Sequence, residues 1–124
     1  MAPEKVILPL GSLENHGWHL PFATDALTAH LIALDVAAQI PKTAVLPPLN
    51  YGASDHYSQF SFTVSLQFET EIAVIEDILE SVYREGIRKV FIMNGHDGNI
   101  TPIDIASRKV KVYHPDIKIV SMDA

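Results

Sequence analysis

The sequence predicts an α/β domain built on a mainly parallel β-sheet. Short apolar runs alternate along the chain with longer segments whose apolar residues recur at helical spacing. Most of these runs end at proline, glycine or other turn-forming residues. An alternation of this kind is typical of β-α-β units, in which helices cover parallel strands.

Each element follows from its local pattern. Thr24 can cap the first helix, Gly86 can end the second, and Pro102 suits the first helical position of the third. The expected strands are residues 6–10, 44–46, 61–66, 89–93 and 117–120. The expected helices are residues 24 to about 39, 69–85 and 101–112, the second with an acidic, solvent-facing side.

Composition narrows the classes of protein that fit. The chain has 124 residues, of which 48% are hydrophobic, enough for one domain over residues 1–124 with its own core. A net charge of -6 argues against a nucleic-acid partner. The absence of cysteine excludes disulfides and thiolate metal sites. No apolar run approaches ~20 residues and no signal peptide is visible, so we expect a cytoplasmic protein without a membrane partner.

The segment from Glu14 to Asp25 holds the strongest chemical signal. It follows the first expected strand and contains two carboxylates and two imidazoles. In extended backbone, Glu14 and His16 project to the same side, roughly 7 Å apart. This spacing suits two ligands of one metal ion, or of a pair of ions.

A second polar segment, Asn94-Gly95-His96-Asp97-Gly98-Asn99, follows the strand at 89–93. Ligands of parallel sheets gather at the carboxyl ends of the strands, so both segments point to one edge. Carboxylates and imidazoles suit zinc, manganese or iron. A simpler interpretation remains open, in which Asn94, Gly95, Asp97 and Asn99 only form a turn and the acids are solvated.

Other side chains are candidates for the surroundings of such a site. His19 could orient a metal ligand, Trp18 could close over a substrate, and His56 could line the pocket. Asn94, Gly95, Asp97 and Asn99 are candidates for the same supporting role. Ser54, Asp55 and His56 are adjacent in sequence and therefore do not form a catalytic triad with one another.

These motifs resemble the signature of the creatininase (creatinine amidohydrolase) family. The resemblance lies in Leu8-Pro-Leu-Gly-Ser12-Leu-Glu14-Asn-His16-Gly-Trp-His19-Leu-Pro21 through Asp25, in 46–52, in 62–66 and in 94–99. It implies a three-layer α/β/α fold and a two-metal site that hydrolyses non-peptide amides. It also implies that Glu14, His16, Asp25 and His96 are metal ligands, with Asp25 as the bridge, and that the protein forms oligomers.

The sequence departs from the family pattern in two respects. It resembles only the N-terminal half of its members, so we expect a truncated domain that lacks a further ligand Glu and a catalytic His. In creatininase itself the residue two places after the motif histidine is an acidic ligand, whereas this chain has Gly98. Creatinine is therefore not the expected substrate.

The sequence favours a metal-dependent amidohydrolase. A hydroxide held by a pair of divalent ions (Zn, Mn or Fe) would attack a cyclic amide or formamide of a small-molecule substrate. Two alternatives stay open: a truncated, inactive metal-binding or assembly module of the same family, and a plain α/β scaffold. A sheet cut in half exposes apolar surface, so we expect a homo-oligomer.

Overall fold

The structure is a computed structural model and describes residues 2–14, 21, 23–54 and 63–124. Four candidate site residues, His16, Trp18, His19 and His56, lie outside these ranges. The elements in chain order are β1 (Lys5–Leu10), α1 (Thr24–Ala37), β2 (Thr43–Val45), α2 (Phe68–Arg84), β3 (Lys89–Asn94), the 3-10 helix η2 (Asp97–Asn99), α3 (Ile100–Tyr113) and β4 (Lys118–Asp123).

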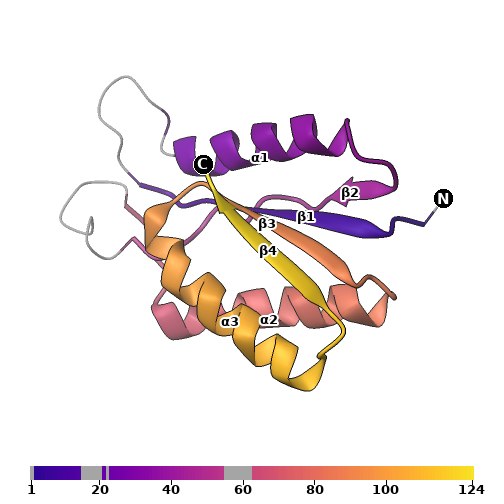
Figure 1. Ribbon diagram of the computed structural model, residues 1–124. Coiled ribbons are helices and arrows are strands. Elements are labelled where there is room, and N and C mark those ends of the chain that lie inside the picture. The colour runs from indigo at the N-terminus through magenta and orange to yellow at the C-terminus, as the bar shows by residue number, and fades with distance from the viewer. Residues whose placement is uncertain (1, 15–20, 22, 55–62) are drawn as a thin grey trace.

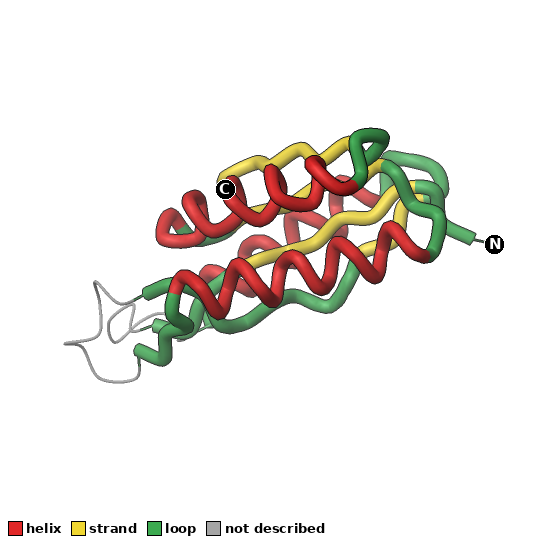
Figure 2. The backbone as a smooth tube through the Cα atoms, turned by 90° about the horizontal axis from the view of Figure 1, so that it is seen from below, coloured by secondary structure: helices red, strands yellow, loops and turns green. Residues whose placement is uncertain are grey.

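The strands form one four-stranded sheet in the order β2-β1-β3-β4, and every neighbouring pair is parallel. Helix α1 lies on one face, and α2 and α3 lie on the other (Figure 1). The helices run roughly along the strands, as the view in Figure 2 shows. The predicted three-layer α/β/α fold with a parallel sheet is confirmed.

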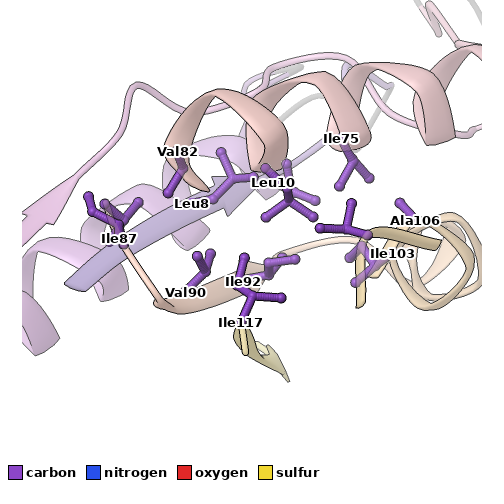
Figure 3. Close-up of a cluster of buried hydrophobic side chains, with 13 residues drawn as sticks. Leu8, Leu10, Ile75, Val82, Ile87, Val90, Ile92, Ile103, Ala106 and Ile117 are labelled. Carbon is purple, nitrogen blue, oxygen red and sulfur yellow. The ribbon is translucent and has the colours of Figure 1, made fainter. Parts of the chain in front are cut away.

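The two faces of the sheet are buried by different helices because side chains alternate along a strand. Val6, Leu8 and Leu10 of β1 point to α2 and α3, where they join the main core (Figure 3). Ile7, between them, points to α1. Each fully buried aliphatic side chain of this kind contributes roughly 1.5–3 kcal/mol. Burial on both faces explains why β1 is a continuous apolar run rather than an alternating one.

Helix α1 packs closely on the sheet because its inner side is made of small residues. Ala26, Ala29 and Ala33 are the buried positions, each at most 1% exposed. Thr24 is not the cap of this helix, contrary to the prediction. Ala23 precedes the first turn, and the Thr24 hydroxyl donates instead to the carbonyl of Pro21.

Two further predictions about elements need correction. Residues 63–66 do not form a strand, since Val64 and Ser65 make only isolated bridges, to Leu13 and Gly52. The third helix starts at Ile100, so Pro102 is its third residue. Gly86 follows α2 with a φ of 90°, the left-handed conformation expected of a residue that ends a helix. None of the described helices has the length and apolar character needed to cross a membrane.

Candidate metal centre

The candidate site lies where the connections of the sheet reverse direction. From β1 the chain crosses to β2 on one side, and then returns past β1 to β3 on the other. The carboxyl ends of β1, β3 and β4 are level, because Leu10, Asn94 and Asp123 are in register. Such switch points leave a crevice beyond the strand ends. Glu14 follows β1 and His96 follows β3, so the predicted convergence of the two motifs is observed.

Glu14, Asp25 and His96 form the centre of the site. One possible ligand atom from each lies within 4.8 Å of the others. The Nδ1 atom of His96 is 3.0 Å from Oδ2 of Asp25 and 3.6 Å from Oε1 of Glu14. Glu14 and His96 are buried, and the Asp25 side chain is 14% exposed. Two carboxylate oxygens and one imidazole nitrogen are a donor set that fits zinc, manganese or iron.

Asp25 reaches this centre from the start of α1, and a glycine makes that approach possible. A Cβ atom on Gly95 would lie 2.2 Å from the carbonyl oxygen of Asp25. The hydroxyl of Ser12 donates to Oδ2 of Asp25 at 2.8 Å and thereby orients the carboxylate. A carboxylate at the first turn is also favoured by the positive end of the helix. Ser12 was not among the predicted site residues.

The other nitrogen of the His96 ring is held by the backbone. Nε2 is 2.9 Å from the carbonyl oxygen of Ala53, to which it donates. A carbonyl bonded to one ring nitrogen is a common way to fix the orientation of a metal-binding histidine. Nδ1 is thus the nitrogen that faces the two carboxylates.

The carboxylates also govern the pKa of His96. Burial alone lowers it, but the hydrogen bond with Asp25, the Ala53 carbonyl and the negative charges of Glu14 and Asp25 together outweigh burial. The pKa is therefore raised above the ordinary value of 6.5. Both ring nitrogens face acceptors, which stabilises the protonated ring relative to a histidine in water.

Two buried asparagines, Asn94 and Asn99, join the loops of the site by hydrogen bonds. The amide of Asn99 donates to the Gly11 carbonyl at 2.9 Å and to Oδ1 of Asn94 at 3.2 Å, and its oxygen accepts from the Ala53 amide at 3.1 Å. Oδ1 of Asn94 also accepts from the His96 amide. The network joins the segments after β1 and β3 to residue 53. Asp97, by contrast, is exposed at the start of η2.

Glu71 is a buried acid that the sequence reasoning missed. It belongs to the helix side predicted to be solvated, yet it has no exposed surface, and neither carboxyl oxygen has a hydrogen-bond partner among the described residues. Burial raises its pKa to about 7, although the nearby charge of His96 and the Ala53 backbone oppose the rise. Glu71 lies four residues before Ile75 and eight before Leu79, which places it on the apolar stripe of α2. This spacing was the signal in the sequence that could have indicated its burial.

The contacts of His96 also resemble those of a catalytic triad, with Ser54 on one side of the ring and Asp25 on the other. The hydroxyl oxygen of Ser54 is 3.4 Å from Nε2 of His96, and Nδ1 faces Asp25. The shorter contact of Nε2, however, is to the Ala53 carbonyl, so this nitrogen carries a hydrogen and does not act as a base. Ser54 is also fully buried, beyond the reach of a substrate. The arrangement supports ion binding better than nucleophilic catalysis.

Comparison with known proteins identifies the family of the chain. The family model of creatinine amidohydrolases, Creatininase, matches residues 2–123. The chain belongs to the creatininase family. It is 32% identical over 115 residues to the creatinine amidohydrolase of Pseudomonas putida. It is 36% identical over 109 residues to a deformylase of Methanococcus maripaludis, 2-amino-5-formylamino-6-ribosylaminopyrimidin-4(3H)-one 5'-monophosphate deformylase. These alignments cover 86% and 85% of the chain but 44% and 47% of the two relatives.

Solved structures of the creatininase family share the fold. A provisionally named creatinine amidohydrolase of Bacteroides fragilis NCTC 9343 superposes with a TM-score of 0.89 at 30% identity, over 99% of this chain and 50% of that one. A structure of creatininase with manganese gives 0.85 at 32% identity, over 95% and 49%. The chain thus spans about half the length of the relatives it matches.

Gly98 is required by the backbone of this family member. A Cβ atom there would lie 2.1 Å from the Ala53 carbonyl oxygen and 2.6 Å from Nε2 of His96. Both distances are far below van der Waals contact. A side chain at this position is therefore incompatible with the hydrogen bond that orients His96. The presence of Gly98, where creatininase has an acidic ligand, is therefore consistent with the local packing.

Proposed function

We propose that this protein is a metal-dependent hydrolase of amide-type C–N bonds, with Glu14, Asp25 and His96 as ligands of a divalent ion. The observation that carries the proposal is the convergence of these three side chains within 4.8 Å at the switch point of the sheet. His16, which follows Glu14 by two residues, is proposed as a fourth ligand on the sequence pattern and family resemblance. Zn, Mn and Fe all suit the donor set, and the structural relatives include manganese and Zn-Zn forms of creatininase.

The residues of the chain have separate tasks in this proposal. A divalent ion, when bound, polarises the carbonyl of the substrate and lowers the pKa of a water molecule. The Ser12 hydroxyl holds Asp25, and the Ala53 carbonyl holds the His96 ring, so two of the ligands are preorganised. Nδ1 of His96 gives up its proton when it becomes a ligand, while Nε2 keeps its hydrogen bond.

The proposed substrate class is a small molecule with a cyclic amide or a formamide. The support lies in two relatives, which are named for a creatinine amidohydrolase and a deformylase. A third relative, from Mycobacterium ulcerans, is 32% identical over 114 residues and is named instead as a mycofactocin precursor peptide peptidase.

A direct test compares metal binding with turnover. Stoichiometric zinc or manganese in the wild type, measured by mass spectrometry after dialysis, is expected to be lost in His96→Ala and Asp25→Asn. His114→Ala is the matched control, since this imidazole pairs with Glu80 on another part of the fold. Metal content that is unchanged in all three variants would contradict the site. Hydrolysis of a panel of cyclic amides and formamides then tests the activity.

A metal-binding or assembly module without catalysis is the second candidate. Two observations favour it. The described residues supply three candidate ligands, and Gly98 supplies no further carboxylate. A two-metal centre needs more protein ligands than these. Metal binding without turnover on any substrate of the panel would support this candidate over the hydrolase.

A further inference from the structure

Asp123, at the end of β4, is a carboxylate that belongs to neither the predicted site nor the cluster of candidate ligands. It is in register with Asn94, the last residue of β3. Oδ1 of Asp123 accepts a hydrogen bond from Nδ2 of Asn94 at 2.9 Å. The backbone joins the same two strands, since the amide of Ala124 donates to the Asn94 carbonyl at 2.7 Å. The end of β4 is therefore tied to the strand that leads into the loop of His96.

The carboxylate of Asp123 favours one orientation of the Asn94 amide. An asparagine side chain presents N–H donors on one side and an acceptor oxygen on the other, whereas an ionised carboxylate only accepts. Asp123 therefore holds the amide nitrogen of Asn94 toward β4. The oxygen faces the other way, where it accepts from the His96 amide at 3.1 Å and from Nδ2 of Asn99 at 3.2 Å. A rotated amide would place N–H groups against both of these donors.

The Asn94 oxygen in turn holds His96 at two points. It accepts directly from the backbone amide of His96. It also accepts from Asn99, whose own side-chain oxygen accepts from the Ala53 amide. The Ala53 carbonyl then accepts from Nε2 of His96. Both the backbone and the ring of His96 are thus linked to Asp123 through a single amide group.

We propose that Asp123 is a positioning residue, which orients His96 as a metal ligand by fixing the amide of Asn94. The inference rests on the proposed function, in which His96 binds a divalent ion. Among the described residues, the ligand atoms that lie within 4.8 Å of one another come from three other side chains, so Asp123 acts through Asn94 rather than on the ion. Residues that orient a metal ligand typically change metal affinity 10–100-fold.

A simpler role for Asp123 is to fasten the end of β4. The backbone hydrogen bond from Ala124 to Asn94 already fastens it. The two roles place different demands on the pair of side chains. Fastening is lost when either side chain is replaced, whereas positioning requires only that residue 94 keeps an acceptor toward His96 and a hydrogen bond to residue 123. An exchange of the two side chains therefore distinguishes them.

Zinc or manganese titrations of the whole chain test the proposal. Asp123→Leu removes the acceptor and is expected to lower the affinity about tenfold. Asp123→Asn keeps an acceptor oxygen and should keep most of the affinity. Asn94→Asp removes the donor and brings two carboxylates together, so its loss should be at least as large. The double variant Asn94→Asp/Asp123→Asn restores the hydrogen bond in the reverse sense, and is expected to recover most of that loss.

A measurement on the metal-free protein separates this inference from the proposed function. Hydrogen exchange of the His96 amide, followed by NMR, should lose protection in Asp123→Leu and in Asn94→Asp and regain it in the double variant. Asp116→Leu is the matched control, because Asp116 accepts hydrogen bonds from Tyr83 and Arg88 just before the start of β4. It should change neither the exchange of this amide nor the metal affinity.

A wild type that binds neither metal contradicts the proposed function, while the exchange rates still decide the role of Asp123. Equal His96 exchange in the wild type and in Asp123→Leu overturns the inference. A double variant that recovers neither protection nor affinity also overturns it, and this comparison with Asn94→Asp decides the matter if Asp123→Leu does not fold. An equal loss in Asp116→Leu overturns it as well, because a general loss of stability then explains both variants.

Discussion

His96 and Asp25 are joined through Nδ1 and Oδ2 at 3.0 Å, on the side of the ring opposite its hydrogen bond to the Ala53 carbonyl. The two contacts have different consequences. The backbone contact keeps the ring in place whatever occupies Nδ1, and the carboxylate contact stabilises a proton there. The same nitrogen thus binds a proton or a metal ion, and the two compete.

Competition predicts a pH dependence of ion binding. Because the pKa of His96 is raised above 6.5, protons should begin to weaken zinc or manganese binding above that pH. Below the pKa the apparent affinity should fall by about tenfold per pH unit if one proton is displaced. Calorimetric titrations between about pH 8.5 and 5.5 measure this slope. An affinity that stays flat over the range would rule out His96 as a ligand.

Replacing Glu71 by leucine should stabilise the protein. The side chain is fully buried, and its carboxyl oxygens have no hydrogen-bond partner among the described residues. An unpaired buried carboxyl costs free energy that an aliphatic side chain of similar size does not. We expect Glu71→Leu to raise the free energy of unfolding at neutral pH by roughly 1–4 kcal/mol in urea denaturation.

Glu69→Leu is the control for this substitution, since Glu69 is exposed in the first turn of the same helix. It should change stability by no more than about 0.5 kcal/mol. A Glu71→Leu protein that is less stable than the wild type would show that the acid has a partner that compensates its burial.

The raised pKa of Glu71 also predicts how the free energy of unfolding varies with pH. Its pKa rises from 4.5 in the unfolded chain to about 7 in the folded protein, so folding takes up a proton between these values. The unfolded state binds fewer protons in this window, and the free energy of unfolding therefore decreases as the pH rises from 4.5 to about 7. The expected loss is on the order of 3 kcal/mol.

His96 acts in the same direction in the metal-free protein, because its pKa is also raised. Its contribution is present below 6.5 and is lost as the pH rises through the folded-state value. A substitution at Glu71 separates the two contributions to the pH dependence of stability. Glu71→Leu should flatten the slope between pH 4.5 and about 6.5, where Glu71 alone of the two contributes, and keep the His96 contribution above pH 6.5. An unchanged slope below that pH in Glu71→Leu would contradict the assignment.

Gly98→Ala should damage the site rather than only the fold. The added Cβ atom would collide with the Ala53 carbonyl and the His96 ring, so the hydrogen bond between them must break. Loss of such an orienting contact typically costs 10–100-fold in metal affinity. We expect a loss in this range together with a lower melting temperature.

Gly86→Ala provides the comparison. Gly86 has a φ of 90° and open space around the position of a Cβ atom. Its substitution should cost about 1 kcal/mol through backbone strain and leave metal affinity unchanged. Equal metal affinities in the two alanine variants would refute the proposed role of the Ala53 contact.

Asn99→Asp should be more destabilising than its small change in shape suggests. The amide of Asn99 donates to the Gly11 carbonyl and to Asn94, and a carboxylate would face both acceptors without a hydrogen. Unmade buried hydrogen bonds cost about 1–3 kcal/mol each, and more for a charged group. Asn50→Asp, at an exposed position, should have little effect. Similar melting temperatures for the two variants would contradict the buried network.

Several features of this protein are determined by local sequence. The alternation of apolar runs and helical segments predicted the parallel sheet, because buried strands and amphipathic helices carry distinct periodicities. The position of Glu14 and His96 after two strands predicted their convergence, since parallel strands end at one edge. Where local signals compete, prediction failed: Thr24 has the chemistry of a cap, but its hydroxyl bonds backward to Pro21.

Other features depend on contacts between residues distant in sequence. The orientation of His96 is set by residue 53, the placement of Asp25 by Ser12, and the burial of Glu71 by the packing of α2 against the sheet. The contacts of His96 and Asp25 leave no periodic signal, and the burial of Glu71 leaves only its place on the apolar stripe of α2. The chain's own residue types determined the fold and the kinds of ligand at its edge. Tertiary structure decided which atoms meet and which acid loses its solvent, because distances and burial arise only when the elements pack.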